Sequence, residues 1–265
     1  MRKQELQKEI SSLLKVELKD LEFDYEKGFQ KVNEITAIDL QGNKTPLILK
    51  RRKDRSEFAF YEEFLSKYDV DSPKWYGYIQ INEYSFLLIK RVAYMQPMWG
   101  GYASTKLALK WLIKKDTICQ QHAESIKKMT SLGKMQWYGI DDWMYEIEVG
   151  SKNKVHPIMT EDFWDLLSSQ VSPLQDVLKS LENSNHSTIS HGDLQMGNIL
   201  FATDSSTKVY VIDWTQPHVT SMCRDVAQLV DYVPENQRLE LIEAYKKEFY
   251  FEEFEQECRR LVQDY

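Results

Sequence analysis

One stretch decides the fold of this chain: Ser190-His191-Gly192-Asp193-Leu194-Gln195-Met196-Gly197-Asn198-Ile199-Leu200-Phe201. A second run, Lys208-Val209-Tyr210-Val211-Ile212-Asp213-Trp214, is apolar and β-branched and carries another acid near its end. The pattern predicts a loop and two short strands, with Asp193, Asn198 and Asp213 at the turning points. A phosphoryl-transfer site requires this layout, because one carboxylate accepts the proton of an attacking hydroxyl while an amide and a second carboxylate hold magnesium.

The bulk composition is that of an ordinary globular protein. The chain has 265 residues, of which 42% are hydrophobic and 28% are charged, so it can form one large domain or two lobes. The formal net charge is −7, which argues against a nucleic-acid partner because such a partner calls for a basic surface.

The remaining composition signals favour a soluble, cytoplasmic protein. Cys119, Cys223 and Cys258 are far apart in the sequence, as expected for reduced thiols in a cytoplasmic core and not for a disulfide framework or a zinc site. The N-terminal segment lacks the continuous apolar region of a signal peptide. The longest aliphatic run, 86–89, is too short to span a bilayer, so we expect no membrane association.

The first 90 residues predict a small lobe with an antiparallel sheet. Helical spacing over residues 4–16 is followed by three strand-like runs at 21–25, 32–40 and 46–50. A capping-box pattern at 54–57 predicts a helix with a buried stripe of Phe58, Tyr61, Leu65 and Tyr68. A hairpin of two further strands, 75–81 and 84–89, completes the lobe.

The rest of the chain predicts a larger, mainly helical lobe. Helical spacing runs from Ser104 to about Leu132, with a buried stripe of Leu107, Trp111, Leu112, Ile118, His122, Ile126 and Met129. Further helices are expected after residue 160, over 174–181 and beyond Asp225, where Leu239, Ile242, Tyr245 and Phe249 share one face. We place the domain boundary near residue 90, with lobes of 1–90 and 91–265.

The HGDLxxxN loop, with its following strand and Ile212-Asp213-Trp214, resembles the aminoglycoside phosphotransferase and choline kinase family. The resemblance implies an α+β, bilobal protein-kinase-like fold. Its small N-terminal lobe would have a five-stranded antiparallel sheet and one main helix, and its larger C-terminal lobe would be mainly helical. It further implies a kinase that transfers the γ-phosphate of ATP, or GTP, to a hydroxyl of a small molecule with the help of Mg²⁺.

The resemblance also assigns roles to individual residues. It makes Asp193 the catalytic carboxylate and Asn198 and Asp213 the metal ligands, although a polar turn could use the same side chains to satisfy its own backbone. His191 is expected to steady the loop and not to act as a base. Asp225 is expected to support the catalytic loop through hydrogen bonds.

The resemblance also implies nucleotide-binding residues in the first lobe and at its boundary with the second. Lys50 ends the third strand and resembles the family's phosphate-binding lysine, which Glu57 would hold in place. Alternatively, Lys50 could be one solvated member of the basic run 50–53, and Glu57 could serve the capping box alone. Ile89 and Arg91 lie where backbone groups of a hinge would bind the base of the nucleotide. The glycine-rich phosphate loop of protein kinases is missing, since only Gly28 lies in that segment.

The acceptor is the part of the function about which the sequence says least. Acidic residues with interleaved aromatics would suit a cationic amine, but solvated helix faces explain them equally well. The loop from Tyr94 to Tyr102 is a candidate substrate lid by position. Two other functions stay open: a nucleotide-binding pseudokinase without turnover, and a protein kinase, against which the short segment between Asp213 and Asp225 argues. The sequence predicts no oligomeric state.

Overall fold

A computed structural model gives the arrangement of the chain and describes residues 3–23, 31–52, 56–82, 84–95, 101–129, 132, 169, 187–203, 208–215 and 217–249. Several predicted features lie outside these residues. They are the capping residue Asp54, the segment around Gly28, the helices expected after 160 and over 174–181, the last helical segment around 254–261, and Cys258.

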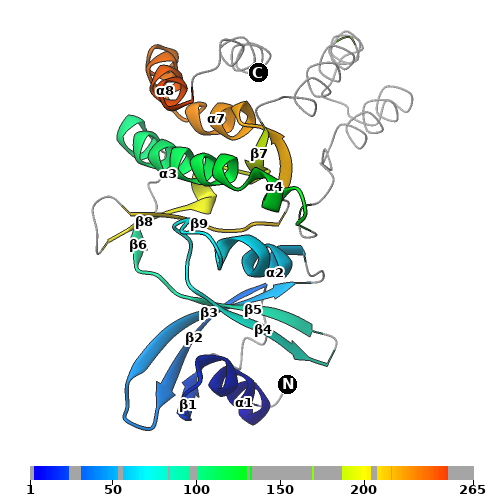
Figure 1. Cartoon of the computed structure of the whole chain (residues 1–265). Coiled ribbons are helices and arrows are strands. Elements are labelled where there is room, and N and C mark those ends of the chain that lie inside the picture. Colours follow the sequence, from blue (N-terminus) through cyan, green and yellow to red (C-terminus); the bar gives the residue numbers. More distant parts are fainter. Residues whose placement is uncertain are drawn as a thin grey trace, which may run out of the picture.

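The small lobe is built on a five-stranded sheet in the order β1-β2-β3-β5-β4, in which every neighbouring pair is antiparallel (Figure 1). The strands are β1 (Leu18–Glu22), β2 (Val32–Asp39), β3 (Lys44–Arg52), β4 (Trp75–Ile81) and β5 (Tyr84–Lys90). The predicted fold class is therefore confirmed for this lobe, including the number of strands and the hairpin of β4 and β5.

Helices cover both faces of this sheet. The amphipathic helix α1 (Lys3–Leu14) buries Leu6 and Ile10 in an apolar cluster with the sheet and contacts β1 and β4. On the side that faces the large lobe, α2 (Ser56–Phe60) continues directly into a π-helical turn, η1 (Tyr61–Leu65) (Figure 1). The aromatic residues of α2 and η1 belong to a different cluster, which extends into the large lobe, so α2 joins the two parts of the molecule.

The large lobe combines helices with short strands that carry the loop quoted at the outset. Its elements are β6 (Tyr94–Met95), α3 (Tyr102–Gln121), α4 (Ala123–Ile126), β7 (Ser187–Ser190), the 3-10 turn η2 (Met196–Asn198), β8 (Ile199–Ala202), β9 (Val209–Val211), β10 (His218–Ser221), α7 (Cys223–Val230) and α8 (Glu235–Glu248). The strands form two small antiparallel sheets, β6-β8-β9 and β10-β7. The predicted strands on either side of residues 203–208 are thus confirmed as β8 and β9.

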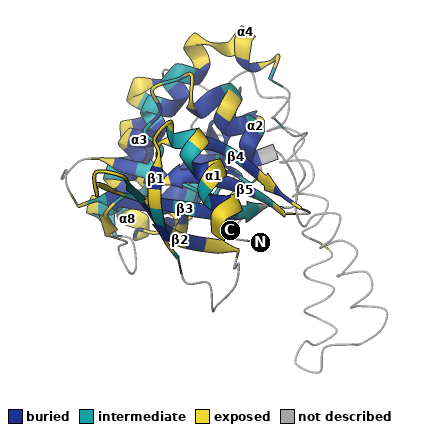
Figure 2. Cartoon of the chain, turned by 90° about the horizontal axis from the view of Figure 1, so that it is seen from below, coloured by how far each residue is buried: buried dark blue, intermediate teal, exposed yellow. Residues whose placement is uncertain are grey.

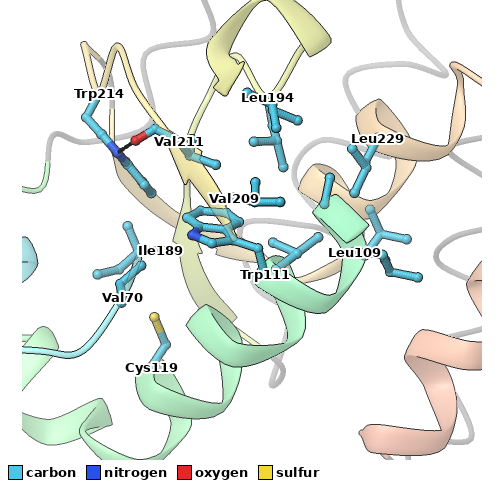
Figure 3. Packing of buried hydrophobic residues seen from close by; sticks show 14 of the residues in the cluster. Val70, Leu109, Trp111, Cys119, Ile189, Leu194, Val209, Val211, Trp214 and Leu229 are labelled. Atoms are coloured by element: carbon cyan, nitrogen blue, oxygen red, sulfur yellow. Dashed lines mark hydrogen bonds between the residues drawn. The ribbon is translucent and has the colours of Figure 1, made fainter. Parts of the chain in front are cut away.

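The core of the large lobe lies between α3, the short strands and α7. Trp111 of α3 and Trp214, next to Asp213, lie close together in it, with ring centroids 6.1 Å apart (Figure 3). Trp214 is fully buried, also packs against Phe60 of α2, and donates a hydrogen bond from its indole to the carbonyl of Val211. Figure 2 shows buried segments on both α2 and α3. The buried residues of these two helices belong to the same apolar cluster as Trp214, so this cluster connects the two lobes.

Three details of the predicted helices are wrong. The long helix ends at Gln121, because His122 leaves the helical conformation (φ −119°, ψ 23°), and α4 follows as a separate turn. The His122 side chain is accordingly exposed, although its ring still contacts Tyr68. In α8 the buried leucine is Leu241, whereas Leu239 is 54% exposed.

The segment proposed as a substrate lid begins with a strand. Tyr94 and Met95 form β6 and pair with Ala202 and Phe201 of β8, so this part of the segment belongs to the β6-β8-β9 sheet. Within the described residues, no helix is long and apolar enough to cross a membrane.

Candidate active site

The β8–β9 hairpin places Asn198 and Asp213 beside each other. Ile199 pairs with Val211, and just outside this pair the amide of Ile212 donates to the carbonyl of Asn198 at 3.0 Å. Asn198 ends the 3-10 turn before β8, and Asp213 comes two residues after β9. In an antiparallel hairpin the start of the first strand lies beside the end of the second. Asn198, just before β8, and Asp213, just after β9, therefore lie at the same end of the hairpin.

Asp193 and Asn198 are in direct contact. The Asn198 amide nitrogen Nδ2 donates to Asp193 Oδ2 at 3.0 Å and to the Asp193 carbonyl at 2.8 Å. Gln195, which the sequence analysis did not select, donates from Nε2 to the same Oδ2 at 3.0 Å. The only sequence signal that could have identified Gln195 is its position, two residues after Asp193. The two amides fix the orientation of the Asp193 carboxylate.

Lys50 connects the small lobe to this site. Its ammonium group lies 2.8 Å from Glu57 Oε1 and 2.6 Å from Asp213 Oδ1. β3 supplies Lys50, α2 supplies Glu57, and the segment after β9 supplies Asp213, so three separate parts of the chain converge on one ammonium. Glu57 is fully buried and Lys50 is 7% exposed. This burial argues against the alternative interpretation, in which Lys50 is a solvated member of the basic run 50–53.

The backbone at Asp213 has an unusual conformation. Its φ angle is +66°, in the left-handed region that non-glycine residues rarely occupy. Such a conformation costs about 1–2 kcal/mol and persists only where surrounding contacts determine it. Those contacts are the Lys50 ion pair, the hydrogen bond from Thr215 N to the Asp213 carbonyl at 2.8 Å, and the burial of the adjoining Trp214.

His191 has the environment of a structural residue. Its Nε2 lies 2.8 Å from the Ile212 carbonyl, its Nδ1 accepts the Asp193 amide at 3.3 Å, and its ring packs on Trp214. These partners require the neutral tautomer that carries its proton on Nε2. Burial lowers the pKa of His191 against the opposing effect of Asp225, which favours the same neutral form.

Ile89 and Arg91, the residues expected at the hinge, lie at the end of β5 and just after it. Ile89 is buried and pairs with Trp75 of β4 and Ile48 of β3. The Arg91 amide donates to the Pro46 carbonyl at 3.0 Å, and its side chain forms an exposed ion pair with Glu34. The Arg91 amide is therefore already used within the sheet.

The donor set suits magnesium held jointly with phosphates. Asn198 uses its Nδ2 on Asp193, which leaves its amide oxygen for a cation, and the Asp213 side chain is 35% exposed. In the part of the chain that the structure describes, no group of three or more His, Cys, Asp or Glu residues could hold a metal. Magnesium is typically held by one or two carboxylates together with substrate phosphates, so a two-residue site fits it.

A substitution at Lys50 tests the role of the ion pair. Lys50→Met is expected to weaken the affinity for Mg·ADP by about 10- to 100-fold, because a hydrogen bond to a charged group contributes about 1.5–3 kcal/mol. Isothermal titration calorimetry measures this affinity.

The variant also leaves the buried Glu57 without its ammonium partner, so it loses stability. Lys50→Met/Glu57→Gln removes both charges and serves as the control. It should recover stability without recovering nucleotide affinity. Wild-type affinity in the double variant would contradict the assignment of Lys50 to phosphate.

Comparisons with known structures show the fold of the whole chain. An aminoglycoside phosphotransferase of Alicyclobacillus acidocaldarius aligns with a TM-score of 0.61 at 10% identity, over 93% of this chain and 79% of that one. An ethanolamine kinase of Plasmodium vivax aligns with a TM-score of 0.56 at 16% identity, over 92% and 71%. An aminoglycoside phosphotransferase of Streptomyces rimosus, in complex with ADP and streptomycin, aligns with a TM-score of 0.56 at 14% identity, over 92% and 91%. The predicted protein-kinase-like fold is confirmed.

Sequence comparison supplies the family. No curated protein matches the chain significantly. The model of the ecdysteroid kinase-like family matches residues 112–263, which is more than half of the chain and includes the catalytic loop, Asn198 and Asp213. With the kinase-like fold and these residues at one site, the chain belongs to the ecdysteroid kinase-like family of small-molecule kinases.

Proposed function

We propose that this protein is a magnesium-dependent kinase that transfers the γ-phosphate of ATP to a hydroxyl group of a small organic molecule. One observation carries the proposal: Lys50, held by buried Glu57, contacts Asp213 at the same end of the β8–β9 hairpin at which Asn198 contacts Asp193. A phosphate-binding cation, two oxygen donors for a metal and a carboxylate base are therefore supplied together.

Each residue has a defined part in the reaction. Asp193 orients the acceptor hydroxyl and accepts its proton as the oxygen attacks the γ-phosphorus, while the bond from that phosphorus to the β–γ bridging oxygen breaks and ADP leaves. Lys50 neutralises phosphate charge, and Asn198 and Asp213 would hold Mg²⁺, which supplies further charge neutralisation when bound. The protein contributes positioning and electrostatic stabilisation, since phosphoryl transfer requires little covalent chemistry from it.

The nucleotide is proposed to lie between residues 1–90 and 91–265, with its base near Ile89 and Arg91. ATP is the proposed donor because the similar Streptomyces rimosus structure contains ADP. A cytoplasmic location would supply ATP and keep thiols reduced, and the described cysteines Cys119 and Cys223 are both buried.

The proposed acceptor is an alcohol, with a polyhydroxylated steroid of the ecdysteroid type as the first candidate because the matching family bears that name. The similar solved structures are named for aminoglycosides and ethanolamine, so these classes belong in the same test.

The test is a coupled assay of ADP formation with Mg·ATP over ecdysteroids, aminoglycosides, ethanolamine, choline and simple sugars, followed by mass spectrometry of the acceptor. A gain of one phosphoryl group on a small molecule supports the proposal. Nucleotide binding without ADP formation across the panel would instead indicate a pseudokinase, and phosphate incorporation into added proteins would indicate a protein kinase. GTP in place of ATP tests the donor.

A further inference from the structure

The amides of the catalytic loop are held by side chains and not by a regular strand or helix. The His191 amide donates to Asp225 (3.1 and 3.2 Å to its two oxygens), and the Gly192 amide donates to Ser190 Oγ at 3.1 Å. The Leu194 amide donates to Gln228 Oε1 at 3.1 Å. Both of the long-range acceptors, Asp225 and Gln228, belong to α7, so the path of the loop depends on how this helix presents them.

A buried lysine determines how Asp225 is presented. Lys115 of α3 is fully buried, and its ammonium lies 2.5 Å from the Ile189 carbonyl, 3.0 Å from Asp225 Oδ2 and 2.9 Å from Asp116 Oδ1. An ammonium has three hydrogens to donate, and here three acceptors surround it. One of them is the backbone of β7 immediately before the loop, and another is the carboxylate that receives the His191 amide.

Asp116 anchors the other side of this group. Its Oδ1 accepts the hydroxyl of Thr188 in β7 at 2.5 Å, and its Oδ2 accepts the hydroxyl of Tyr245 in α8 at 2.5 Å. Two adjacent residues of α3 therefore bind β7 at two consecutive residues, Thr188 and Ile189, and connect it to α7 and α8. We call Lys115, Asp116 and Asp225 the buried charge cluster.

The pKa shifts of Lys115 and Asp225 agree with this geometry. Burial alone would lower the pKa of Lys115, but Asp116 and Asp225 outweigh it and raise the pKa, so the ammonium is retained. Burial would raise the pKa of Asp225, but Lys115 and Ser190 bring it below its usual value. Fully buried charged residues are rare unless they are paired. Because all three residues of the buried charge cluster are fully buried, we expect it to have a specific role.

We propose that Lys115 is a positioning residue for phosphoryl transfer, which fixes the catalytic loop by binding the Ile189 carbonyl and orienting Asp225 toward the His191 amide. The proposal rests on the proposed function for its kinetic consequence, but not for its structural one. The loop segment 191–194 carries Asp193, so a displacement of its backbone moves the reacting carboxylate relative to Lys50 and Asp213, which other elements hold.

The structural test is hydrogen–deuterium exchange followed by mass spectrometry on peptides that cover 187–195. In the wild type, the amides of 191–194 should exchange at least tenfold more slowly than those of exposed described segments such as 40–43. Fast exchange of the loop in the wild type would by itself overturn the proposal.

The main variant is Lys115→Met/Asp225→Asn, which removes the cation and one carboxylate together. It leaves no lone charge at Asp225, and the asparagine oxygen can still accept from Ser190 and the His191 amide. Exchange over 187–195 should rise at least tenfold, because the ammonium that orients residue 225 and binds the Ile189 carbonyl is then lost. Exchange at the wild-type rate in this folded variant would show that the cluster only balances charge, and would refute the positioning role.

Lys114→Met is the matched control. Lys114 is the preceding residue of the same helix, but its ammonium pairs with Asp69 and Asp71 at the surface. This variant should leave exchange at 187–195 unchanged, and equal loosening in both variants would contradict the assignment to Lys115.

The kinetic test uses the acceptor found in the screen, and otherwise the slow hydrolysis of ATP by water. Lys115→Met/Asp225→Asn should lower kcat at least tenfold with the KM for ATP changed less than threefold, since Lys50, Glu57 and Asp213 are not altered. A change confined to thermal stability, with wild-type kcat for the folded fraction, would overturn the proposal. If the wild type shows no turnover with any acceptor or with water, the proposed function fails while the exchange result still decides the role of Lys115.

Discussion

Asp193→Asn is expected to lower the rate of phosphoryl transfer by about 10²- to 10⁴-fold, the range that a positioned general base contributes. The substituted amide can still accept the hydrogen bonds of Asn198 and Gln195 through its oxygen, but it cannot accept the proton of an acceptor hydroxyl. Because Asp193 is exposed, the free energy of unfolding should change by no more than about 0.5 kcal/mol.

The measurement separates catalysis from binding. Steady-state kinetics with the acceptor found in the screen should show the loss in kcat, while calorimetry with Mg·ADP should show affinity within about threefold of the wild type. Asp69→Asn is the control, since Asp69 lies at the surface with its side chain 93% exposed. Full activity in Asp193→Asn would remove Asp193 from the reaction and with it the proposed mechanism.

Trp214→Ala is expected to lower the free energy of unfolding by about 3–5 kcal/mol, the usual cost of truncating a fully buried tryptophan or phenylalanine. Trp214 is 0% exposed and contacts Phe60 of α2, Trp111 of α3 and the ring of His191, so its loss leaves a cavity where both lobes meet. Since the total free energy of unfolding of a domain is about 5–15 kcal/mol, this variant should unfold at a much lower urea concentration.

Urea unfolding followed by circular dichroism measures the effect, with the midpoint shifting at an unchanged slope if the unfolded state is unaffected. Trp214→Phe keeps an aromatic ring and loses the indole hydrogen bond to Val211, so it should recover most of the lost stability. A shift below about 1 kcal/mol in Trp214→Ala would be incompatible with the packing around this residue.

The sequence predicted the small lobe well because its signals are local. Alternation, turn residues and a short apolar strand that ends on Lys50 specify five strands, and the structure has all five in one antiparallel sheet. The catalytic hairpin was predictable for the same reason, since Asn198, β8, β9 and Asp213 follow one another within a short stretch. Family resemblance assigned Lys50 and Asp213 to one site, but their direct contact was not predicted, because the two residues are 163 positions apart.

The buried charge cluster could not be predicted in this way. Helical spacing predicts that the apolar residues of α3 form its buried face. It gives no reason to expect Lys115 and Asp116 in the core, because charged side chains are rarely buried without partners. Those partners, Ile189 and Asp225, lie 74 and 110 positions from Lys115, so no local pattern reveals them. The exposed Leu239 shows the converse, because an apolar residue at helical spacing need not face the core.

The two amides on Asp193 have a consequence for the regiochemistry of the reaction. Asn198 and Gln195 both approach Oδ2, and no described residue donates to Oδ1. In the proposed reaction, the incoming alcohol would therefore meet the carboxylate through Oδ1 alone and from a single direction. On a molecule with several neighbouring hydroxyls, only the one that reaches Oδ1 while facing the phosphorus would be modified, so we expect a single regioisomer as product.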